Sequence, residues 1–229
     1  MRKNLISAAL AASFLVGAAG VAQAEESPIS ANVTFASEYV YRGYAQSNEN
    51  FAVQGGFDYA HDSGFYIGTW ASSIDWLDEG GAEVDVYAGF SNSIGDTDFS
   101  YDVGVLQYFY PGGKIDGNDA DTTEAYIGFG WKFLSIKYSY AFTDLFGVED
   151  SDGSEYYEMG ADFDLGAGFA LGAHVGRQKI EGGTSYNDWK LGVSKEFIGL
   201  TWGVDYIDTD LDDDDNGDER IVVSVTKSF

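Results

Sequence analysis

Residues 219–229, ERIVVSVTKSF, form the stretch of sequence that decides the fold. Side chains alternate between the two faces of an extended strand, so Ile221, Val223 and Phe229 share one face. The chain stops where this apolar strand stops. An unpaired apolar edge favours aggregation, and closing the sheet into a barrel removes that edge. We therefore expect this strand to pair with the first strand of a closed barrel.

The composition favours long strands. The chain of 229 residues has only two prolines, against 30 glycines, 16 Phe, 16 Tyr and 5 Trp. Strands exclude proline from their interior and favour aromatic side chains. A low mean hydropathy beside so many aromatic residues is what alternation between a lipid face and a wet face produces. There is no cysteine, which excludes disulfides and thiolate metal sites.

The charge narrows the classes of partner. The formal net charge is -26, from 38 acidic and 12 basic residues. Nucleic acid is excluded as a partner, because its binding requires a basic stripe. The chain also lacks the polybasic patch with which peripheral proteins hold anionic lipid. Two interpretations of the acidic residues remain: they keep the surface soluble, or they bind cations.

The amino terminus has the pattern of a secretory signal peptide over residues 1–24. Arg2 and Lys3 precede an apolar run, and Ala-Gln-Ala at 22–24 provides the small residues of a cleavage site. A retained transmembrane anchor is the alternative, because the run approaches the length that spans a bilayer. The clean cleavage site favours removal, which leaves residues 25–229 as the mature domain.

Extended segments and turns alternate after Pro28, with no stretch of helical period. An even number of strands, about twelve, is predicted, as bacterial outer-membrane barrels have, each about as long as a tilted membrane-spanning strand. The predicted strands lie near 31–45, 51–60, 65–73, 82–90, 99–105, 124–131, 136–142, 157–165, 169–176, 189–196, 200–206 and 219–229.

The connections carry independent information, because long and short ones alternate. The long ones are predicted at 46–50, 77–81, 111–122, 143–154, 179–188 and 208–218. This pattern is typical of a transmembrane antiparallel up-and-down β-barrel with short periplasmic turns and longer, acidic extracellular loops. Both ends of the mature chain are then expected on the periplasmic side.

A secreted β-sandwich or a soluble lipocalin-like barrel is the alternative fold, and two features count against it. The polar faces hold many glycines, which weaken exposed strands but suit a curved wall or a narrow lumen: Gly56, Gly104, Gly128, Gly130, Gly160, Gly172, Gly176, Gly192 and Gly203. Large aromatic residues fall near predicted strand ends, as in interfacial girdles: Tyr39, Tyr41, Tyr108, Tyr110, Trp131, Trp189, Trp202 and Tyr206.

Three stretches of the first strands resemble a known family. They are SEYVYRGYAQS at 37–47, AVQGGFDY at 52–59 and GFYIGTWASS at 64–73. In these stretches the chain is similar to the TorF-like group of bacterial outer-membrane porins, and the remainder matches that group by pattern. The resemblance implies an outer-membrane barrel with a pore in a Gram-negative bacterium. It implies no particular substrate.

The alternation assigns a set of charged residues to the inside of the barrel. These expected pore-lining residues are Glu38, Arg42, Asp58, Glu83, Asp85, Asp102, Glu124, Lys137, Glu158, Asp162, Asp164, His174, Lys190, Asp205 and Arg220. Such charges must be paired or hydrated. A hydrated lumen with excess acid favours cations. If acids and bases instead pair across the lumen, the barrel is closed, and a barrel of this strand number allows both outcomes.

The last long loop contains the start of a calcium-binding pattern. Asp212, Asp214 and Asn216 have the spacing of the first ligands of an EF-hand loop, but Val223 stands where that loop requires glutamate. We therefore expect weak calcium or magnesium binding at most, bridging to lipopolysaccharide phosphates, or a simple solvated loop. No other cofactor is expected. The expected partners are outer-membrane lipid and lipopolysaccharide, the barrel-assembly machinery, and small solutes or ions.

An enzyme is the third class of function considered. A barrel hydrolase or acyltransferase needs a base beside a nucleophile, and the sequence offers only two histidines, His61 and His174. His174 shares the lumenal face with Ser139 and Ser194, but no motif supports catalysis. The sequence therefore favours a narrow, mildly cation-preferring diffusion channel over a closed surface-interaction barrel, and both over an enzyme.

Overall fold

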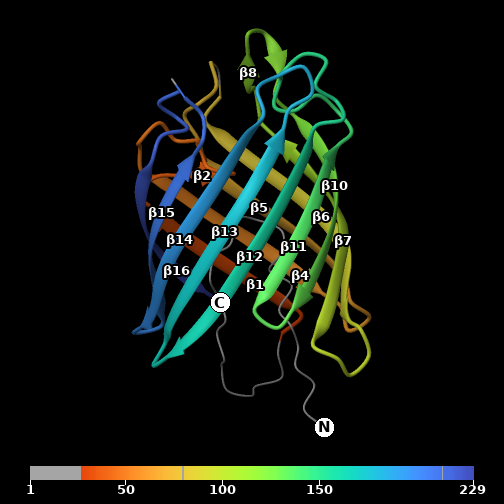
Figure 1. Cartoon of the computed structure of the whole chain (residues 1–229), viewed down its shortest axis with the longest axis vertical. Helices are drawn as coiled ribbons and strands as arrows, with labels where there is room; N and C mark the ends of the chain where they lie inside the picture. The colour runs from red at the N-terminus through yellow and green to blue at the C-terminus, as the bar shows by residue number, and fades with distance from the viewer. Residues whose placement is uncertain (1–26, 79, 213) are drawn as a thin grey trace.

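The computed structural model describes residues 27–229 except 79 and 213, so the predicted signal peptide lies outside the described residues. Twelve antiparallel strands form one closed barrel (Figure 1). In chain order they are β1 (Ile29–Ala36), β4 (Ala52–Ala60), β5 (Phe65–Ser73), β6 (Ala82–Ser93), β7 (Phe99–Phe109), β10 (Thr122–Trp131), β11 (Leu134–Ala141), β12 (Glu155–Gly166), β13 (Phe169–Lys179), β14 (Tyr186–Phe197), β15 (Leu200–Thr209) and β16 (Arg220–Ser228). Within the described residues, no helix is long and apolar enough to cross a membrane.

The barrel closes between its first and last strands, as the terminal sequence predicts. β1 pairs antiparallel with β16, with Phe35 opposite Val225. Ala31 and Phe229 exchange backbone hydrogen bonds of 2.9 and 3.3 Å. Every barrel strand therefore has a partner on both sides, and the sheet has no free edge.

Long connections gather at one end of the barrel and short turns at the other (Figure 1). This confirms the predicted alternation of connection lengths. Two of the long connections contain small hairpins outside the barrel sheet. They are formed by β2 (Val40–Tyr41) with β3 (Tyr44–Ala45), and by β8 (Lys114–Ile115) with β9 (Asn118–Asp119).

The first strand is shorter than predicted, and this changes the first loop. A single strand over 31–45 is wrong, because β1 ends at Ala36 and residues 37–51 form a long loop around the β2–β3 hairpin. Arg42 and Gly43 form the hairpin turn with φ of 48° and 81°. Two consecutive left-handed residues reverse the chain in a two-residue turn. The apolar–polar alternation continues through this loop, which concealed the boundary in the sequence.

The two faces of the wall have opposite character. Along β5, Tyr66, Trp70 and Ser72 are buried, whereas Phe65 and Ile67 are exposed. Large apolar side chains are exposed around the outside of the barrel, among them Phe57, Val105, Ile136, Leu191 and Val223. The barrel therefore has an apolar outside and a polar, aromatic inside.

The predicted aromatic girdle is only half right. Trp131, Trp189, Trp202 and Tyr206 are exposed on the outer face, but Tyr39, Tyr108 and Tyr110 are buried inside. Tyr41 is also turned inward, where its hydroxyl lies 2.7 Å from that of Tyr108. Tyr108 and Tyr110 are an even number of residues from the buried Leu106, so they share its inward face. Closeness to a strand end does not predict a place in the girdle. Whether an aromatic side chain points outward or inward depends on its position in the alternation along the strand.

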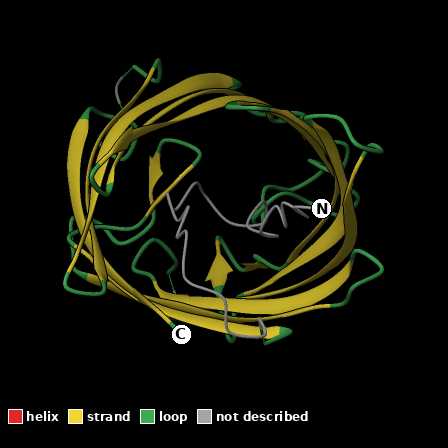
Figure 2. Cartoon of the chain, turned by 90° about the horizontal axis from the view of Figure 1, so that it is seen from below, coloured by secondary structure: helices red, strands yellow, loops and turns green. Residues whose placement is uncertain are grey.

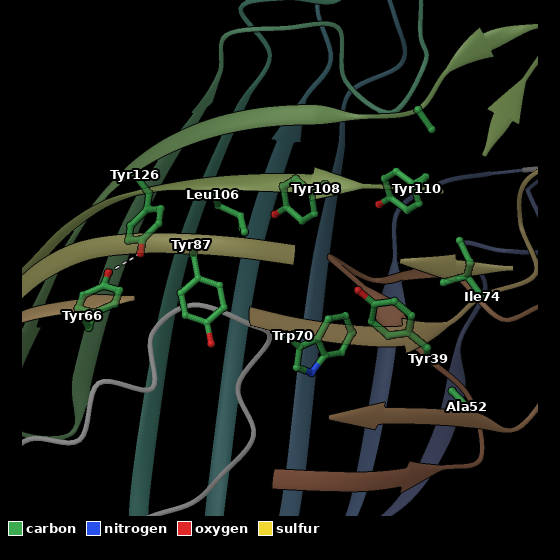
Figure 3. Packing of buried hydrophobic residues seen from close by; sticks show 11 residues of the cluster. Tyr39, Ala52, Tyr66, Trp70, Ile74, Tyr87, Leu106, Tyr108, Tyr110 and Tyr126 are labelled. Carbon is green, nitrogen blue, oxygen red and sulfur yellow. Dashed lines mark hydrogen bonds between the residues drawn. The ribbon is translucent and has the colours of Figure 1, made fainter. Parts of the chain in front are cut away.

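Tyrosine rings fill the space above several of the inward-facing glycines. A Cβ atom on Gly104 would meet the hydroxyl of Tyr126, and one on Gly68 would meet the ring of Tyr87. Figure 3 shows these rings reaching inward from the strands, with the hydroxyls of Tyr66 and Tyr126 hydrogen-bonded. The glycines therefore provide room, as the sequence predicts, and tyrosine rings from neighbouring strands occupy it.

We expect Gly104→Ala to destabilise the barrel and Gly128→Ala to leave its stability nearly unchanged. A Cβ on Gly104 would also lie 2.9 Å from the Ala88 carbonyl oxygen, whereas the nearest atom to one on Gly128 is 3.5 Å away. Overpacking costs about 1–3 kcal/mol of unfolding free energy. Urea unfolding in detergent micelles, followed by tryptophan fluorescence, measures the difference. Equal effects of the two substitutions would contradict the proposed packing.

Candidate functional site in the lumen

The first long loop folds into the barrel and crosses its lumen. Figure 2, seen from the short-turn end, shows loop segments inside the ring of strands. A Cβ on Gly43, at the tip of the β2–β3 hairpin, would meet side-chain atoms of Thr209 on β15 and Asp188 on β14. The hairpin follows β1 directly in sequence, whereas the strands that its tip meets, β14 and β15, lie near the end of the chain. It narrows the lumen at this level.

Arg42 at the hairpin turn is the main anchor of this loop. Its Nη2 and Nη1 atoms lie 2.7 and 3.0 Å from the two carboxylate oxygens of Glu124 on β10. Nη1 also donates to Gln178 Oε1 on β13 at 2.8 Å. The guanidinium lies 4.2 Å from the ring centroid of Tyr156 on β12. The planar fork of arginine suits this combination of bidentate pairing and stacking.

The Arg42–Glu124 pair is buried, with 8% and 4% of the two side chains exposed. Removing one partner of a buried pair leaves an uncompensated charge and costs about 3–5 kcal/mol. The hairpin is therefore held in the lumen by an interaction that is costly to break.

A second anchor holds the other end of the loop on the opposite wall. Tyr39 donates its hydroxyl to Glu83 Oε1 at 2.8 Å, and Tyr110 donates to Glu83 Oε2 at 2.8 Å. Glu83, on β6, is 1% exposed. The ring of Tyr39 also contacts that of Trp70, with centroids 5.3 Å apart. Two phenol donors thus satisfy both oxygens of a fully buried carboxyl group.

The wall formed by β4 to β7 carries carboxyl groups that tyrosines hold. Tyr87 donates to Asp58, and Tyr66 donates to Asp102 at 2.7 Å. Asp85, 5% exposed, has one side-chain oxygen without a hydrogen-bond partner in the described part of the chain. We call this side of the lumen, with Asp58, Glu83, Asp85 and Asp102, the acid–tyrosine wall.

The wall formed by β11 to β15 carries ion pairs. Lys137 Nζ lies 2.7 Å from Glu158 Oε1, and His174 Nε2 lies 2.9 Å from Asp188 Oδ1. Lys190 interacts electrostatically with two further predicted lumenal residues, Asp162 and Asp205. We call this side, with these three basic residues and their acidic partners, the ion-pair wall.

The remaining predicted lining residues lie at the two ends of the barrel. Arg220 Nη1 lies 3.0 Å from Glu38 Oε1 at the loop end, and both side chains are largely buried. Asp164 lies near the short turn after β12, where its exposed carboxylate accepts the Gly166 amide at 2.7 Å. The fifteen predicted residues thus divide among the two walls, the inward loop and the two ends of the barrel.

Sequence reasoning missed Asp188 as a site residue. It was assigned to the long connection at 179–188, but it is the third residue of β14 and 3% exposed. The Tyr156 hydroxyl donates to Asp188 Oδ2 at 2.9 Å, beside the contact with His174. Asp188 lies two residues before Lys190 on the same strand, so the two side chains share a face. Extending the strand by one residue from Trp189 would have placed Asp188 in the lumen with Lys190.

An aromatic cluster packs the long-loop end of the barrel. Phe146, from the connection between β11 and β12, has its ring centroid 5.2 Å from that of Tyr108 and 5.5 Å from that of Tyr41. Trp76 and Tyr110 complete this mouth cluster, with centroids 5.4 Å apart. Four different long connections and the end of β7 meet in it, so the loops over this part of the mouth are packed together.

The acidic loop before β16 makes local contacts. The Asn216 amide donates to Asp214 Oδ1 at 3.1 Å, and the Tyr44 hydroxyl donates to the same oxygen at 3.4 Å, while Asp212 is exposed. A backbone hydrogen bond from the Asn187 amide lowers the pKa of Asp210 at the start of this loop. Among the described residues, no group of three or more His, Cys, Asp or Glu side chains is arranged to hold a metal ion. Weak divalent binding at this loop stays a prediction.

The two histidines lie in different settings. His61 is in the turn before β5, with its Nδ1 2.8 Å from the Ser63 hydroxyl. His174 Nε2 contacts Asp188 and the hydroxyl of Tyr156 at 2.9 Å. These neighbours make His174 a member of the polar lining of the ion-pair wall.

Solved outer-membrane porins have the same fold. The barrel is similar to the KdgM porin in complex with disordered oligogalacturonate, with a TM-score of 0.59 and 11% identity over 87% of this chain and 99% of that chain. It is similar to the NanC porin, with a TM-score of 0.57 and 11% identity over 86% and 97% of the two chains. The COG4313 outer membrane channel from Pseudomonas putida F1 has a TM-score of 0.55 and 11% identity over 92% and 99%. At such identities the likeness shows the fold alone.

In sequence, no curated protein matches the chain. One family match covers nearly the whole chain, over residues 22–229, and that family is described as a bacterial protein of unknown function, Gcw_chp. The chain belongs to the Gcw_chp family.

Proposed function

We propose that the protein is an outer-membrane barrel that forms a narrow channel for passive diffusion of ions or small solutes. The observation that carries this proposal is the polarity of the wall, with apolar side chains outside and a charged, tyrosine-rich lining inside. A soluble barrel requires the opposite arrangement, with apolar side chains inside and polar side chains outside, because apolar surface is buried away from water. Around a barrel in lipid the same arrangement is stable, and the polar lining then faces a wet lumen.

The outer surface supports a position in lipid. Phe57, Ile221 and Leu191 are 64%, 66% and 54% exposed. In water, each Å² of such surface costs about 25 cal/mol relative to an apolar environment. The likeness to porins, the resemblance to the TorF-like group and the signal-peptide pattern of residues 1–24 all agree with an outer membrane. Lipopolysaccharide and the barrel-assembly machinery are the corresponding partners in this proposal, and no catalytic role is assigned.

The lining supports a mild preference for cations. Glu83, Asp85 and Asp102 lie on the acid–tyrosine wall, where tyrosine hydroxyls donate hydrogen bonds to Glu83 and Asp102. The basic residues Lys137 and Lys190 lie on the ion-pair wall, each beside carboxylates. Fixed carboxylates in a narrow wet passage raise the local concentration of cations and repel anions. The acid excess of the lumen is therefore expected to act on permeating ions.

A closed barrel is the second candidate, and the packed loop end favours it. The mouth cluster and the Arg42 anchor both reduce the open cross-section. In that alternative the protein acts through its acidic, divalent-binding loops at the surface.

Purified, refolded protein in a planar bilayer is expected to conduct ions. In a potassium chloride gradient, the reversal potential should have the sign of potassium preference, because carboxylates exceed basic residues in the lumen. Raising the salt concentration should weaken the preference, since exposed charges are screened over about 10 Å at 0.1 M. A barrel that inserts and shows no conductance would contradict the channel and favour the closed alternative.

Arg42→Ala is expected to raise the unit conductance and the preference for cations. The substitution leaves Glu124 without its bidentate partner and removes a positive charge from the constriction. Arg42→Lys should have a smaller effect, because lysine keeps the charge but loses the planar fork. Single-channel recording measures both properties.

The matched control is Lys132→Ala. It also breaks an ion pair, with Asp98, but both side chains are exposed and the distance is 3.9 Å. This control should conduct as the unmodified protein does. If Arg42→Ala conducts no better than Lys132→Ala, the loop is not the constriction. In the closed-barrel alternative, only Arg42→Ala conducts.

A further inference from the structure

A small cavity lies in the lumen beneath the inward hairpin. Residues 40–43 of the hairpin cover it, and side chains of β7 and β10 to β15 form its walls. Its volume is about 90 Å³. One water needs roughly 10–15 Å³ of such space, so the cavity has room for a solute of a few heavy atoms.

The cavity is lined by charges of both signs in adjacent pairs. The Lys137–Glu158 ion pair faces it from β11 and β12, and the carboxylate of Asp188, in contact with the His174 ring, faces it from β13 and β14. Arg42 with Glu124 faces it from the hairpin and β10. Lys190 of the ion-pair wall is part of the same lining. Four basic side chains thus gather at one place in a chain of net charge -26.

An ion pair in the lining can bind a solute when each of its members exchanges its partner for a group of the solute of the same charge. This requirement discriminates between solutes by their charged groups. An ion of one sign that enters such a pair binds one member and leaves the other without a partner. An unpaired charge in a confined site is costly. A zwitterion supplies both signs: its carboxylate replaces the acid beside Lys137, and its ammonium group replaces the base beside Glu158. The number of satisfied charges then stays the same.

Aromatic rings add to this selectivity. Lys137 Nζ already lies 5.6 Å from the ring centroid of Tyr126, and the Arg42 guanidinium lies 4.7 Å from that of Tyr41. Both rings line the cavity. A ligand ammonium group that displaces Lys137 from Glu158 would meet the same ring of Tyr126, and cation–π contacts contribute most where water is partly excluded.

We propose that this cavity is a subsite for small zwitterionic solutes that carry both a carboxylate and an ammonium group. The subsite names the substrate class of the channel, so it rests on the proposed function. Exchange of partners at existing ion pairs makes binding weak, and weak binding suits permeation, which requires that solutes leave as well as enter.

Four solutes of nearly equal size and shape test the proposal in proteoliposomes. Alanine is the zwitterion, lactamide the neutral analogue, alaninamide the cation and lactate the anion. Uptake of each labelled solute is measured at neutral pH. Alanine uptake is expected to exceed lactamide uptake by about two- to fivefold, the range that one partly hydrated ion pair supplies. Uptake of alaninamide should exceed uptake of lactate, because the proposed channel prefers cations.

These arms separate the two proposals. No uptake of any solute, with correctly inserted protein, overturns the channel itself. Uptake of all four with alanine no faster than lactamide overturns the subsite and leaves the channel standing.

A paired substitution tests the assignment to these residues. Lys137→Met with Glu158→Gln removes one ion pair without changing the net charge, and should abolish the advantage of alanine over lactamide. The control is Lys179→Met with Glu155→Gln, which removes the same type of pair, 2.9 Å apart, outside the cavity lining. The control should retain the advantage. Equal behaviour of the two double variants overturns the assignment.

A measurement on the unmodified protein covers the case in which the double variant does not fold. Addition of alanine should reduce the potassium current through single channels, because both occupy the same narrow passage, and lactamide at the same concentration should reduce it less. Equal reduction by alanine and lactamide overturns the subsite.

Discussion

A sheet without an edge is the constraint on which the other features of this protein depend. Once β1 pairs with β16, every strand must present one face outward and one face inward around the full circle. In the described chain no other element covers the outer apolar face, and the buried aromatic cluster lies inside the ring of strands. Polarity inside and apolarity outside are therefore consequences of closure combined with the alternating sequence.

Within that closed wall, chemistry is distributed unevenly. The acid–tyrosine wall holds Glu83 and Asp102 through phenol hydroxyls, whereas the ion-pair wall holds Glu158 and Asp188 through Lys137 and His174. Both arrangements satisfy buried carboxyl groups. They differ in the group that holds the carboxyl, which is a phenol hydroxyl on the first wall and a basic side chain on the second. The inward loop contacts both walls, through Tyr39 and Glu83 on one and through Arg42 and Gln178 on the other.

The sequence was sufficient for the fold, because strand alternation and loop-length alternation are independent signals that agree. It predicted the barrel, its closure and the alternation of its strand faces. It failed for residues 31–45, where a polar–apolar alternation suited both a strand and an inward loop. The Arg42-Gly43 turn, with positive φ at both positions, interrupts this stretch in the structure. In the sequence, Gly43 was the one residue that indicated a turn there. The pairing of Arg42 with Glu124 joins residues 82 positions apart, and no local pattern encodes such a contact.

The anchoring of the first loop depends on strands that come much later in the chain. Arg42 is synthesised early, but its partners Glu124, Tyr156 and Gln178 belong to β10, β12 and β13. The full set of Arg42 contacts therefore requires all three of these strands. The seat of Arg42 is thus shared by strands that are distant in sequence, so the position of the first loop depends on the completed wall.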